Sequence, residues 1–261
     1  MELSGFGSRT FDGEVKRPSW NLSTSKLLVI FFDWVESLIG RFSKVGDQPV
    51  YDNTLFPWAY DVEQEWIKIR GELEQVMKRR EELPSFHEIT SEVKDITNDE
   101  HWKTYFLAGY GVMSEENCRR CPEAARILKK IPGMKTAFFS ILSPKKHIPP
   151  HRGVYNGVLR YHLGLIVPEP KENCRIRIGN EIRHWEEGKS LIFDDTYEHE
   201  VWNDTSGYRV VLFVDFVRPI KFPFNLLNLF LLFIARYTPW MQEGLQNQKK
   251  WEMKFYWGLK T

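Results

Sequence analysis

Two histidines in the second half of the sequence have the residue type and setting of a metal site. His151 ends a proline-rich stretch, and His199 follows 48 residues later. Neutral imidazole is the commonest protein ligand for iron and similar metals. We place His151 at the end of a loop and His199 between two strands, and we expect a β-barrel to bring both rings together. The alternative for each histidine is a hydrogen bond that satisfies it within the core.

Cationic side chains lie near these histidines on strands that are otherwise apolar. Arg209 begins the run that continues through Val210–Phe213. A guanidinium that points inward there is costly unless it meets an anion, and its fork can hold a carboxylate through two hydrogen bonds. A buried salt bridge is the alternative. Arg160 and His162 are two residues apart, so they face one side of a strand and suit an acidic ligand, unless that side faces solvent.

The elements that must position these residues change character along the chain. Short β-rich runs without helices between them indicate an antiparallel sandwich or barrel. We expect strands at 136–142, 158–167, 174–178, 190–193 and 208–217, and an earlier buried strand marked by Trp102, Tyr105 and Phe106. Helical periodicity predicts helices at 26–42, 60–82 and 122–130, then through 240 and across 242–257. The fold class is therefore a mainly β core with helical additions (α+β).

Four regions follow from this change of pattern. Residues 1–50 form an N-terminal arm and amphipathic helix, and residues 51–133 form a helical support region. Residues 134–220 form the β core, and residues 221–261 form a helical extension rich in basic and aromatic residues. Residues 218–261 contain seven Lys or Arg and two Glu, which fits contact with a membrane surface through residues 222–257. Packing of this tail on the barrel or on a second copy is the alternative.

Composition limits the compartment and the partners. A net charge of +1 gives no indication of a nucleic-acid partner. Three cysteines argue against a disulfide framework, and Cys118 and Cys121 are expected to be unpaired thiols. We see no secretory signal, and neither 26–42 nor 226–235 has the length and apolar character of a spanning helix. The expectation is a cytoplasmic protein that can lie at the membrane periphery.

At this point the sequence resembles the catalytic domain of the aspartyl/asparaginyl β-hydroxylases, which are Fe(II)- and 2-oxoglutarate-dependent dioxygenases. The runs LRYHLGLIVP, WEEGKSLIFDDTYEHEVWN and YRVVLFVDFVRP are each similar to strands of that family, in the same order. The resemblance covers roughly residues 134–220. It implies a double-stranded β-helix, a jelly-roll or cupin-like fold, flanked by N- and C-terminal helices.

The resemblance also implies roles for individual residues. His151 and His199 would be the iron ligands, and Arg209 and Ser140 would hold the distal carboxylate of 2-oxoglutarate. Arg160 and His162 would approach its metal-binding end. The common triad has a carboxylate two residues after the first histidine, where this chain has Gly153, so water or chloride is left as a ligand. Asp194 and Asp195 are interpreted as turn residues, and no catalytic role is assigned to Trp185.

Three functions are compatible with these residues. The first is hydroxylation with Fe(II), 2-oxoglutarate and O₂ of an aspartyl or asparaginyl β-carbon in a peptide, or of a related small molecule. The second is hydroxylation of a lipid acyl chain at a membrane surface, as in the bacterial lipid A hydroxylases, which carry Asp where Gly153 stands. The third is a jelly-roll metal protein that is non-catalytic or has non-oxygenase chemistry. Arg209, Arg160 and His162 favour the first two, because they suit a diacid cosubstrate.

Overall fold

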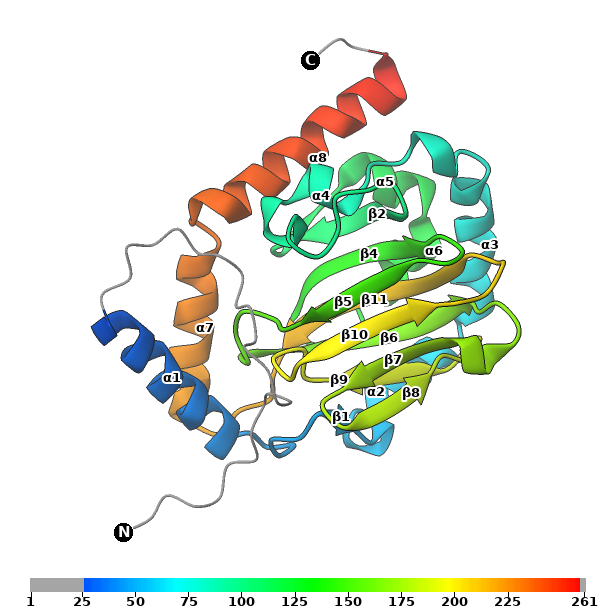
Figure 1. The fold of residues 1–261 in the computed structure, drawn as a ribbon. Helices are drawn as coiled ribbons and strands as arrows, with labels where there is room; N and C mark the ends of the chain where they lie inside the picture. The colour runs from blue at the N-terminus through cyan, green and yellow to red at the C-terminus, as the bar shows by residue number, and fades with distance from the viewer. Residues whose placement is uncertain (1–25, 259–261) are drawn as a thin grey trace.

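The computed structural model describes residues 26–258, and two antiparallel sheets that face each other form its centre (Figure 1). The larger sheet has seven strands in the order β1-β9-β6-β11-β4-β2-β3, and the smaller sheet has four in the order β5-β10-β7-β8. From β4 to β11 the chain passes repeatedly between the two sheets, which is the winding of a double-stranded β-helix. The predicted jelly-roll fold is confirmed. The strands are β1 Val50–Tyr51, β2 Trp102–Gly109, β3 Val112–Met113, β4 Met134–Leu142, β5 His147–His151, β6 Val158–Ile166, β7 Cys174–Ile178, β8 Glu181–His184, β9 Ser190–Phe193, β10 His199–Asn203 and β11 Arg209–Val217.

Alternate residues of the central strands fill two separate cores, because successive side chains of a strand point to opposite faces. On β4, Phe138 faces the smaller sheet while Phe139 packs toward the helices. The Phe138 ring stacks against Phe106 of β2 and Phe213 of β11, with centroids 4.6 and 4.2 Å apart. The interior between the sheets is therefore tightly filled on this side, and it leaves the polar residues of the site at defined positions.

Helices cover the outer face of the larger sheet and extend beyond it (Figure 1). They are α1 Lys26–Arg41, α2 Pro57–Glu63, α3 Trp66–Met77, α4 Phe86–Ile89, α5 Glu115–Arg120, α6 Pro122–Leu128, α7 Phe224–Ala235 and α8 Pro239–Trp257. Among the described residues, no helix is both long and apolar enough to cross a membrane. The arm expected over residues 1–25 lies outside the described range.

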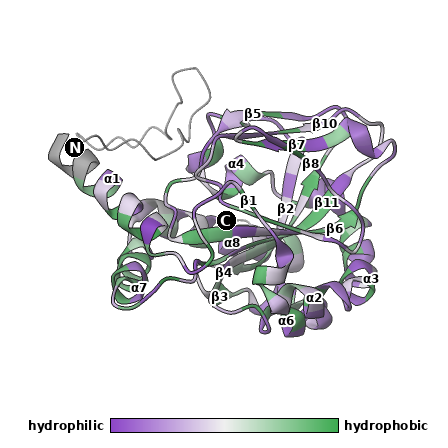
Figure 2. Cartoon of the chain, turned by 90° about the horizontal axis from the view of Figure 1, so that it is seen from below, coloured by the Kyte–Doolittle hydropathy of each residue, from purple (hydrophilic) through white to green (hydrophobic). Residues whose placement is uncertain are grey.

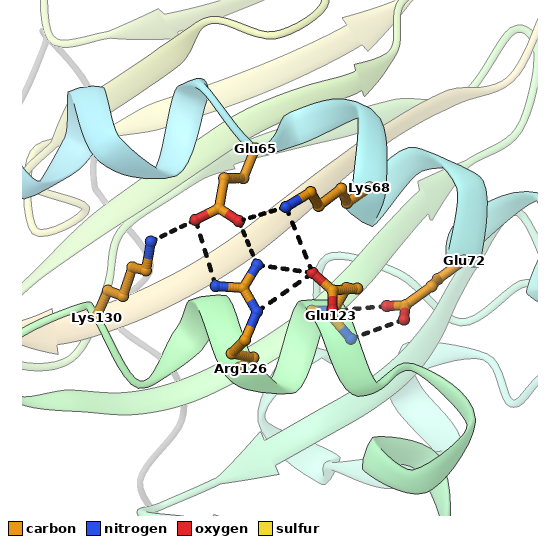
Figure 3. A network of polar contacts seen from close by, with 7 residues as sticks. Glu65, Lys68, Glu72, Glu123, Arg126 and Lys130 are labelled. Carbon is orange, nitrogen blue, oxygen red and sulfur yellow. Dashed lines mark hydrogen bonds and ion pairs between the residues drawn. The ribbon is translucent and has the colours of Figure 1, made fainter.

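An ionic network joins α3 to α6 (Figure 3). The Glu72 carboxylate accepts hydrogen bonds from the backbone N–H groups of Glu123 and Ala124, at 2.7 and 2.8 Å. It thereby caps α6, whose own cap residue makes no side-chain hydrogen bond. Glu65, just before α3, pairs with Lys68 of α3, with Arg126 of α6 and with Lys130 just after α6. The support helices are thus fixed to one another by polar contacts as well as by packing.

The single helix expected over residues 60–82 is wrong, because the chain forms α2 and α3 with a break between them. The break follows Glu63, which is buried and accepts hydrogen bonds from the backbone N–H and the hydroxyl of Ser190 on β9. A straight helix would carry this carboxylate away from the sheet. The break therefore lets α2 dock against β9 while α3 runs along the sheet.

Two further expectations about local structure are corrected. His151 belongs to strand β5 rather than to a loop, and His199 begins strand β10 rather than lying between strands. The two prolines of β5 are tolerated because β5 is an edge strand of the smaller sheet. In the region 51–133, expected as a helical support, the buried strand marked by Trp102 is confirmed as β2, and β3 and part of the edge strand β1 also join the larger sheet. The β core thus extends beyond residues 134–220.

Candidate active site

His151 and His199 are direct cross-strand partners on β5 and β10. Their ring centroids are 4.1 Å apart, so both rings can reach one ion. Each Nδ1 lies at hydrogen-bonding distance from a backbone carbonyl two residues earlier, 2.8 Å from Pro149 O and 2.9 Å from Tyr197 O. A carbonyl only accepts, so each Nδ1 carries the proton and each Nε2 keeps a free lone pair. Both histidines therefore have the tautomer that a metal ligand needs.

Burial keeps both imidazoles neutral. Desolvation lowers the pKa of His151 to about 4 and lowers the pKa of His199 well below its ordinary value. The neighbouring His151 and the Arg160 guanidinium lower the pKa of His199 further, because two cations side by side would repel each other. The physical cause is the cost of placing a charged ring in a low-dielectric interior. Neutral rings are ready to donate lone pairs at physiological pH.

Arg209 points into the barrel from β11 and is 2% exposed. Its Nη1 donates to the Ser140 hydroxyl over 3.4 Å, and its Nε has no hydrogen-bond partner among the described residues. Within that part of the chain no carboxylate pairs with it, and burial lowers its pKa to about 10. The salt-bridge alternative is therefore not what the structure shows. A buried guanidinium with unused donors is poised to receive an anion.

Trp185, to which the sequence analysis assigned no catalytic role, lies against Arg209. The guanidinium carbon lies 4.7 Å from the Trp185 ring centroid, and the ring is 1% exposed. A cavity of about 500 Å³ beside β1 and β9 has Trp185 in its lining but neither of the two histidines on β5 and β10. Aromatic packing orients a guanidinium at small cost in hydrogen bonds. No sequence signal distinguishes this tryptophan from one that merely begins a turn.

His162 lies across the barrel interior from the histidine pair, on β6. Its ring centroid is 5.1 Å from Phe193 and 5.0 Å from Phe213. Neither ring nitrogen has a hydrogen-bond partner among the described residues, although both are buried. Desolvation, then Arg209 and Arg160, lowers its pKa well below the ordinary value. A buried, neutral and unsatisfied imidazole is a donor or acceptor left for a ligand.

Arg160 faces the same interior but already has carboxylate partners. It contacts Asp195 at 2.8 Å and Asp215 at 2.9 Å, and it lies over the Phe213 ring at 4.2 Å. The expected shared face of Arg160 and His162 is found, since both lie against Phe213. Contact of Arg160 with 2-oxoglutarate stays a prediction, because two acids already satisfy much of this guanidinium.

Asp195 fills the space beside Gly153, the position where the common triad has its carboxylate ligand. A Cβ built on Gly153 would lie 2.2 Å from Asp195 Oδ2, and the Gly153 N–H donates to the Asp195 carbonyl at 2.7 Å. The Asp195 carboxyl thus occupies the space that a side chain at 153 would need. Asp194, by contrast, accepts hydrogen bonds from Thr196 in a turn, as expected, and it also forms a buried ion pair with Arg218 that the sequence did not predict.

These residues fit a divalent iron bound by two imidazoles. Within the described residues, no cluster of three or more His, Cys, Asp or Glu is placed to hold a metal ion. Two neutral nitrogen donors suit iron and leave several coordination positions open for small oxygen ligands. The thiols of Cys118, Cys121 and Cys174 are free, and Cys174 lies near enough to Arg209 to interact with its charge. The geometry defines a jelly-roll protein with a cross-strand pair of neutral histidines and a buried arginine that has no acidic partner among the described residues.

Comparison with known proteins identifies the family. The family model described as aspartyl/asparaginyl β-hydroxylase matches residues 63–219. An ornithine lipid ester-linked acyl 2-hydroxylase from Rhizobium tropici is 52% identical over 240 residues, covering 92% of this chain and 84% of that protein. The human aspartyl/asparaginyl β-hydroxylase is 38% identical over 199 residues, covering 69% of this chain but 25% of the human protein. A Pseudomonas putida prolyl-4-hydroxylase structure shares 15% identity at a TM-score of 0.42, over 61% of this chain and 98% of that one.

The chain belongs to the aspartyl/asparaginyl β-hydroxylase family. It is therefore a member of a family of hydroxylases, and the resemblance found in its strand motifs is confirmed.

Proposed function

We propose that this protein uses Fe(II), 2-oxoglutarate and O₂ to hydroxylate an acyl chain of an amino-acid-containing lipid. The observation that carries the oxygenase chemistry is the cross-strand pair of neutral histidines with free Nε2 atoms, in a barrel that also holds a buried arginine with no acidic partner among the described residues. The choice of substrate is supported by the 52% identity to an ornithine lipid hydroxylase over 92% of the chain. That breadth favours a lipid over the peptide that the strand motifs alone suggested.

In this proposal the protein residues bind and orient the reactants. His151 and His199 hold the iron through Nε2, and the carbonyls of Pro149 and Tyr197 fix the orientation of both rings. When bound, iron with 2-oxoglutarate supplies the oxidising power that an unactivated C–H bond requires. Arg209 and the Ser140 hydroxyl grip the distal carboxylate of the diacid, while the Trp185 ring keeps the guanidinium in place.

The interior surroundings exclude water from this reaction. Phe193 lies against both His199 and His162, with centroids 5.8 and 5.1 Å away, and Phe213 packs on the other side of His162. A dry interior strengthens the charge pairing between Arg209 and a carboxylate and limits side reactions. His162 is placed to donate to or accept from the cosubstrate through a nitrogen that has no hydrogen-bond partner within residues 26–258.

The test is turnover by the purified full chain with Fe(II), 2-oxoglutarate and detergent-dispersed lipid. Succinate and lipid that has gained one oxygen atom are measured, with an aspartyl peptide offered in parallel. We expect lipid hydroxylation, and a loss of about 100-fold or more in His199→Ala. His147→Ala is the matched control, because His147 lies on β5 but is exposed and bonded to Glu200.

Each outcome decides between the functions. Hydroxylation of the peptide and not the lipid would replace the proposed substrate while keeping the oxygenase chemistry. Equal succinate release by wild-type protein and His199→Ala would reject the iron-dependent reaction. A location at the membrane periphery follows from the proposed substrate, and the cytoplasmic compartment expected from the sequence stays a prediction.

A further inference from the structure

The outward face of α7 is apolar although it faces solvent. No charged residue occurs between Phe224 and Ala235. Phe230 and Phe233 each expose 58% of their surface, and Phe222 just before the helix exposes 78%. Exposed large side chains recur at three- and four-residue steps, which places them on one side of the helix. They are Leu226, Leu229, Phe230, Phe233 and Ile234, with Phe222 and Tyr237 beyond the two ends.

The inward face of α7 carries a polar residue instead. Asn228 is fully buried, and it donates to the carbonyl of Gly157 at 2.9 Å and accepts from the Tyr155 hydroxyl at 2.9 Å. Phe224 and Leu231 lie on the same side and pack against α1. A surface helix of a soluble domain normally carries polar residues on its outward face, whereas the outward face of α7 is apolar. The helix is therefore built to face an apolar medium.

Helix α1 enlarges this surface. Figures 1 and 2 show α1 and α7 side by side at one edge of the molecule, beyond the strands. Val35 and Ile39 of α1 pack toward α7, and the Phe42 ring stacks on Phe224 with centroids 4.1 Å apart. Phe31, Phe32 and Trp34 of α1 remain exposed. We call these three residues, together with the seven exposed residues of α7 and its ends, the apolar patch.

Positive charges lie at both ends of the apolar patch. Lys44 and Lys221 are exposed where the end of α1 meets the start of α7, as the hydrogen bond from Lys44 N to Pro219 O shows. Arg41 is exposed nearby, and Arg236 is exposed at the far end of α7. Among the described residues of α1, Asp33 is the exposed acid. Aromatic and aliphatic residues bordered by cations have the composition that binds an anionic lipid surface.

The patch is fastened to the loop that follows His151. Asn156 donates to the Glu36 carbonyl of α1 at 2.8 Å, and Arg152 lies 3.8 Å from the Glu36 carboxylate. The bonds of Asn228 to Tyr155 and Gly157 tie the same loop to α7. The loop runs from His151 to the start of β6, so the helices hold a fixed position relative to the histidine end of the barrel.

Helix α8 does not share this character, although it belongs to the tail that was expected to contact lipid. Its Glu243 accepts from Ser91, its Glu252 accepts from Ser114, and Tyr256 donates to Asn117. Trp251 packs against the main core. The structure therefore divides residues 222–257 into α8, which packs on the body, and α7, which is left exposed.

We propose that the apolar patch inserts into the interface of an anionic bilayer and thereby presents the histidine end of the barrel to membrane lipid. The choice of a bilayer rests on the proposed lipid substrate and on the charges. A second copy is disfavoured, because both ends of the patch are basic and a symmetric pair would oppose like charges. The alignment to the lipid hydroxylase covers 92% of the chain, so it includes both α1 and α7. The family match, over residues 63–219, includes neither of these helices.

Vesicle flotation of the full chain tests this surface without any turnover. Vesicles of equal parts phosphatidylglycerol and phosphatidylcholine are compared with pure phosphatidylcholine. We expect wild-type protein to float with the anionic vesicles. The double variant Phe230→Ser/Phe233→Ser should bind these vesicles at least about tenfold more weakly. The matched control is Ile67→Ser/Ile182→Ser, which removes two exposed apolar side chains from α3 and β8, and it should bind like wild type.

The remaining measurements separate the possible failures. Thermal unfolding of both double variants shows whether they are folded. Quenching of tryptophan fluorescence by brominated lipid reports insertion of α1 directly, and we expect less quenching in Trp34→Phe. Wild-type protein that hydroxylates detergent-dispersed lipid but ignores vesicles would reject the surface and keep the proposed function. Vesicle binding by a protein that fails to turn over lipid would support the surface and reject the function. A dimer in solution that the Phe230→Ser/Phe233→Ser change dissociates would overturn the proposal.

Discussion

Replacing Gly153 with alanine should destabilise the fold through a single atom. The added Cβ would lie 2.2, 2.3 and 2.5 Å from the three outer atoms of the Asp195 carboxyl, where ordinary contact is 3.4–4 Å. The carboxyl has little freedom to move, because it pairs with Arg160 at 2.8 Å and its own backbone carbonyl accepts from the Gly153 N–H. Either the backbones separate or the ion pair is strained.

The magnitude follows from these contacts. Overpacking costs about 1–3 kcal/mol, and complete loss of one partner from a buried pair costs about 3–5 kcal/mol. Arg160 keeps its contact with Asp215, so the pair is not lost completely. The smaller entropy of an unfolded alanine offsets about 0.5–1 kcal/mol. We expect the free energy of unfolding to fall by about 2–4 kcal/mol.

Urea unfolding followed by circular dichroism measures this change, with a chelator present so that bound metal does not contribute. Gly71→Ala is the control, since Gly71 lies in α3 with nothing within 4 Å of its Cβ position. It should gain about 0.5–1 kcal/mol. In Asp195→Ala, the further change Gly153→Ala should cost little, because the atoms it strikes are gone. A Gly153→Ala protein as stable as wild type would refute the reasoning.

Two further predictions concern charge inside the barrel. Arg209→Met removes a buried cation that has no acidic partner among the described residues, so urea unfolding should show stability unchanged or raised by about 1–2 kcal/mol. The KM for 2-oxoglutarate should rise about tenfold or more. A large loss of stability would show that Arg209 is structural. Burial raises the pKa of Glu92 to about 7 from an ordinary 4.5, so its contribution to stability is complete below about pH 4.5 and is lost as the pH rises to about 7. Glu92→Gln should therefore flatten the fall in unfolding free energy between pH 5 and pH 8, and identical slopes for the two proteins would contradict this. The charged groups that act on Glu92 are Arg160, Asp195, Asp215 and Glu243.

The apolar strands were the predictable part of the fold. The strands expected at 174–178 and 190–193 match β7 and β9, and the expected ends of the other three differ by a residue or two. Their runs of β-branched and aromatic residues favour a half-buried strand over a helix or a loop. The strands that carry His151 and His199 were not predicted. One contains two prolines and the other mixes charged and polar residues, so neither has the usual composition of a strand.

The site was predictable only where a residue type is itself unusual. A histidine pair and an arginine on an apolar strand are conspicuous in the sequence, and the structure places all three in the interior of one barrel. The contact of Asp195 with Gly153 and the packing of Trp185 on Arg209 were not predictable. Both join residues that are distant in the chain, and neither residue type signals its partner. Tertiary contacts of this kind are decided by the register of the sheets and leave no local pattern.

The pairing of His151 with His199 has a consequence for the lifetime of the protein. β5 lies at the edge of the smaller sheet, and edge strands are among the first segments to open locally. An ion held by both rings would link β5 to β10 in addition to the backbone hydrogen bonds between these strands. Opening β5 would then require release of the ion. Starvation for iron would then loosen the rim of the barrel and expose it to cellular proteases.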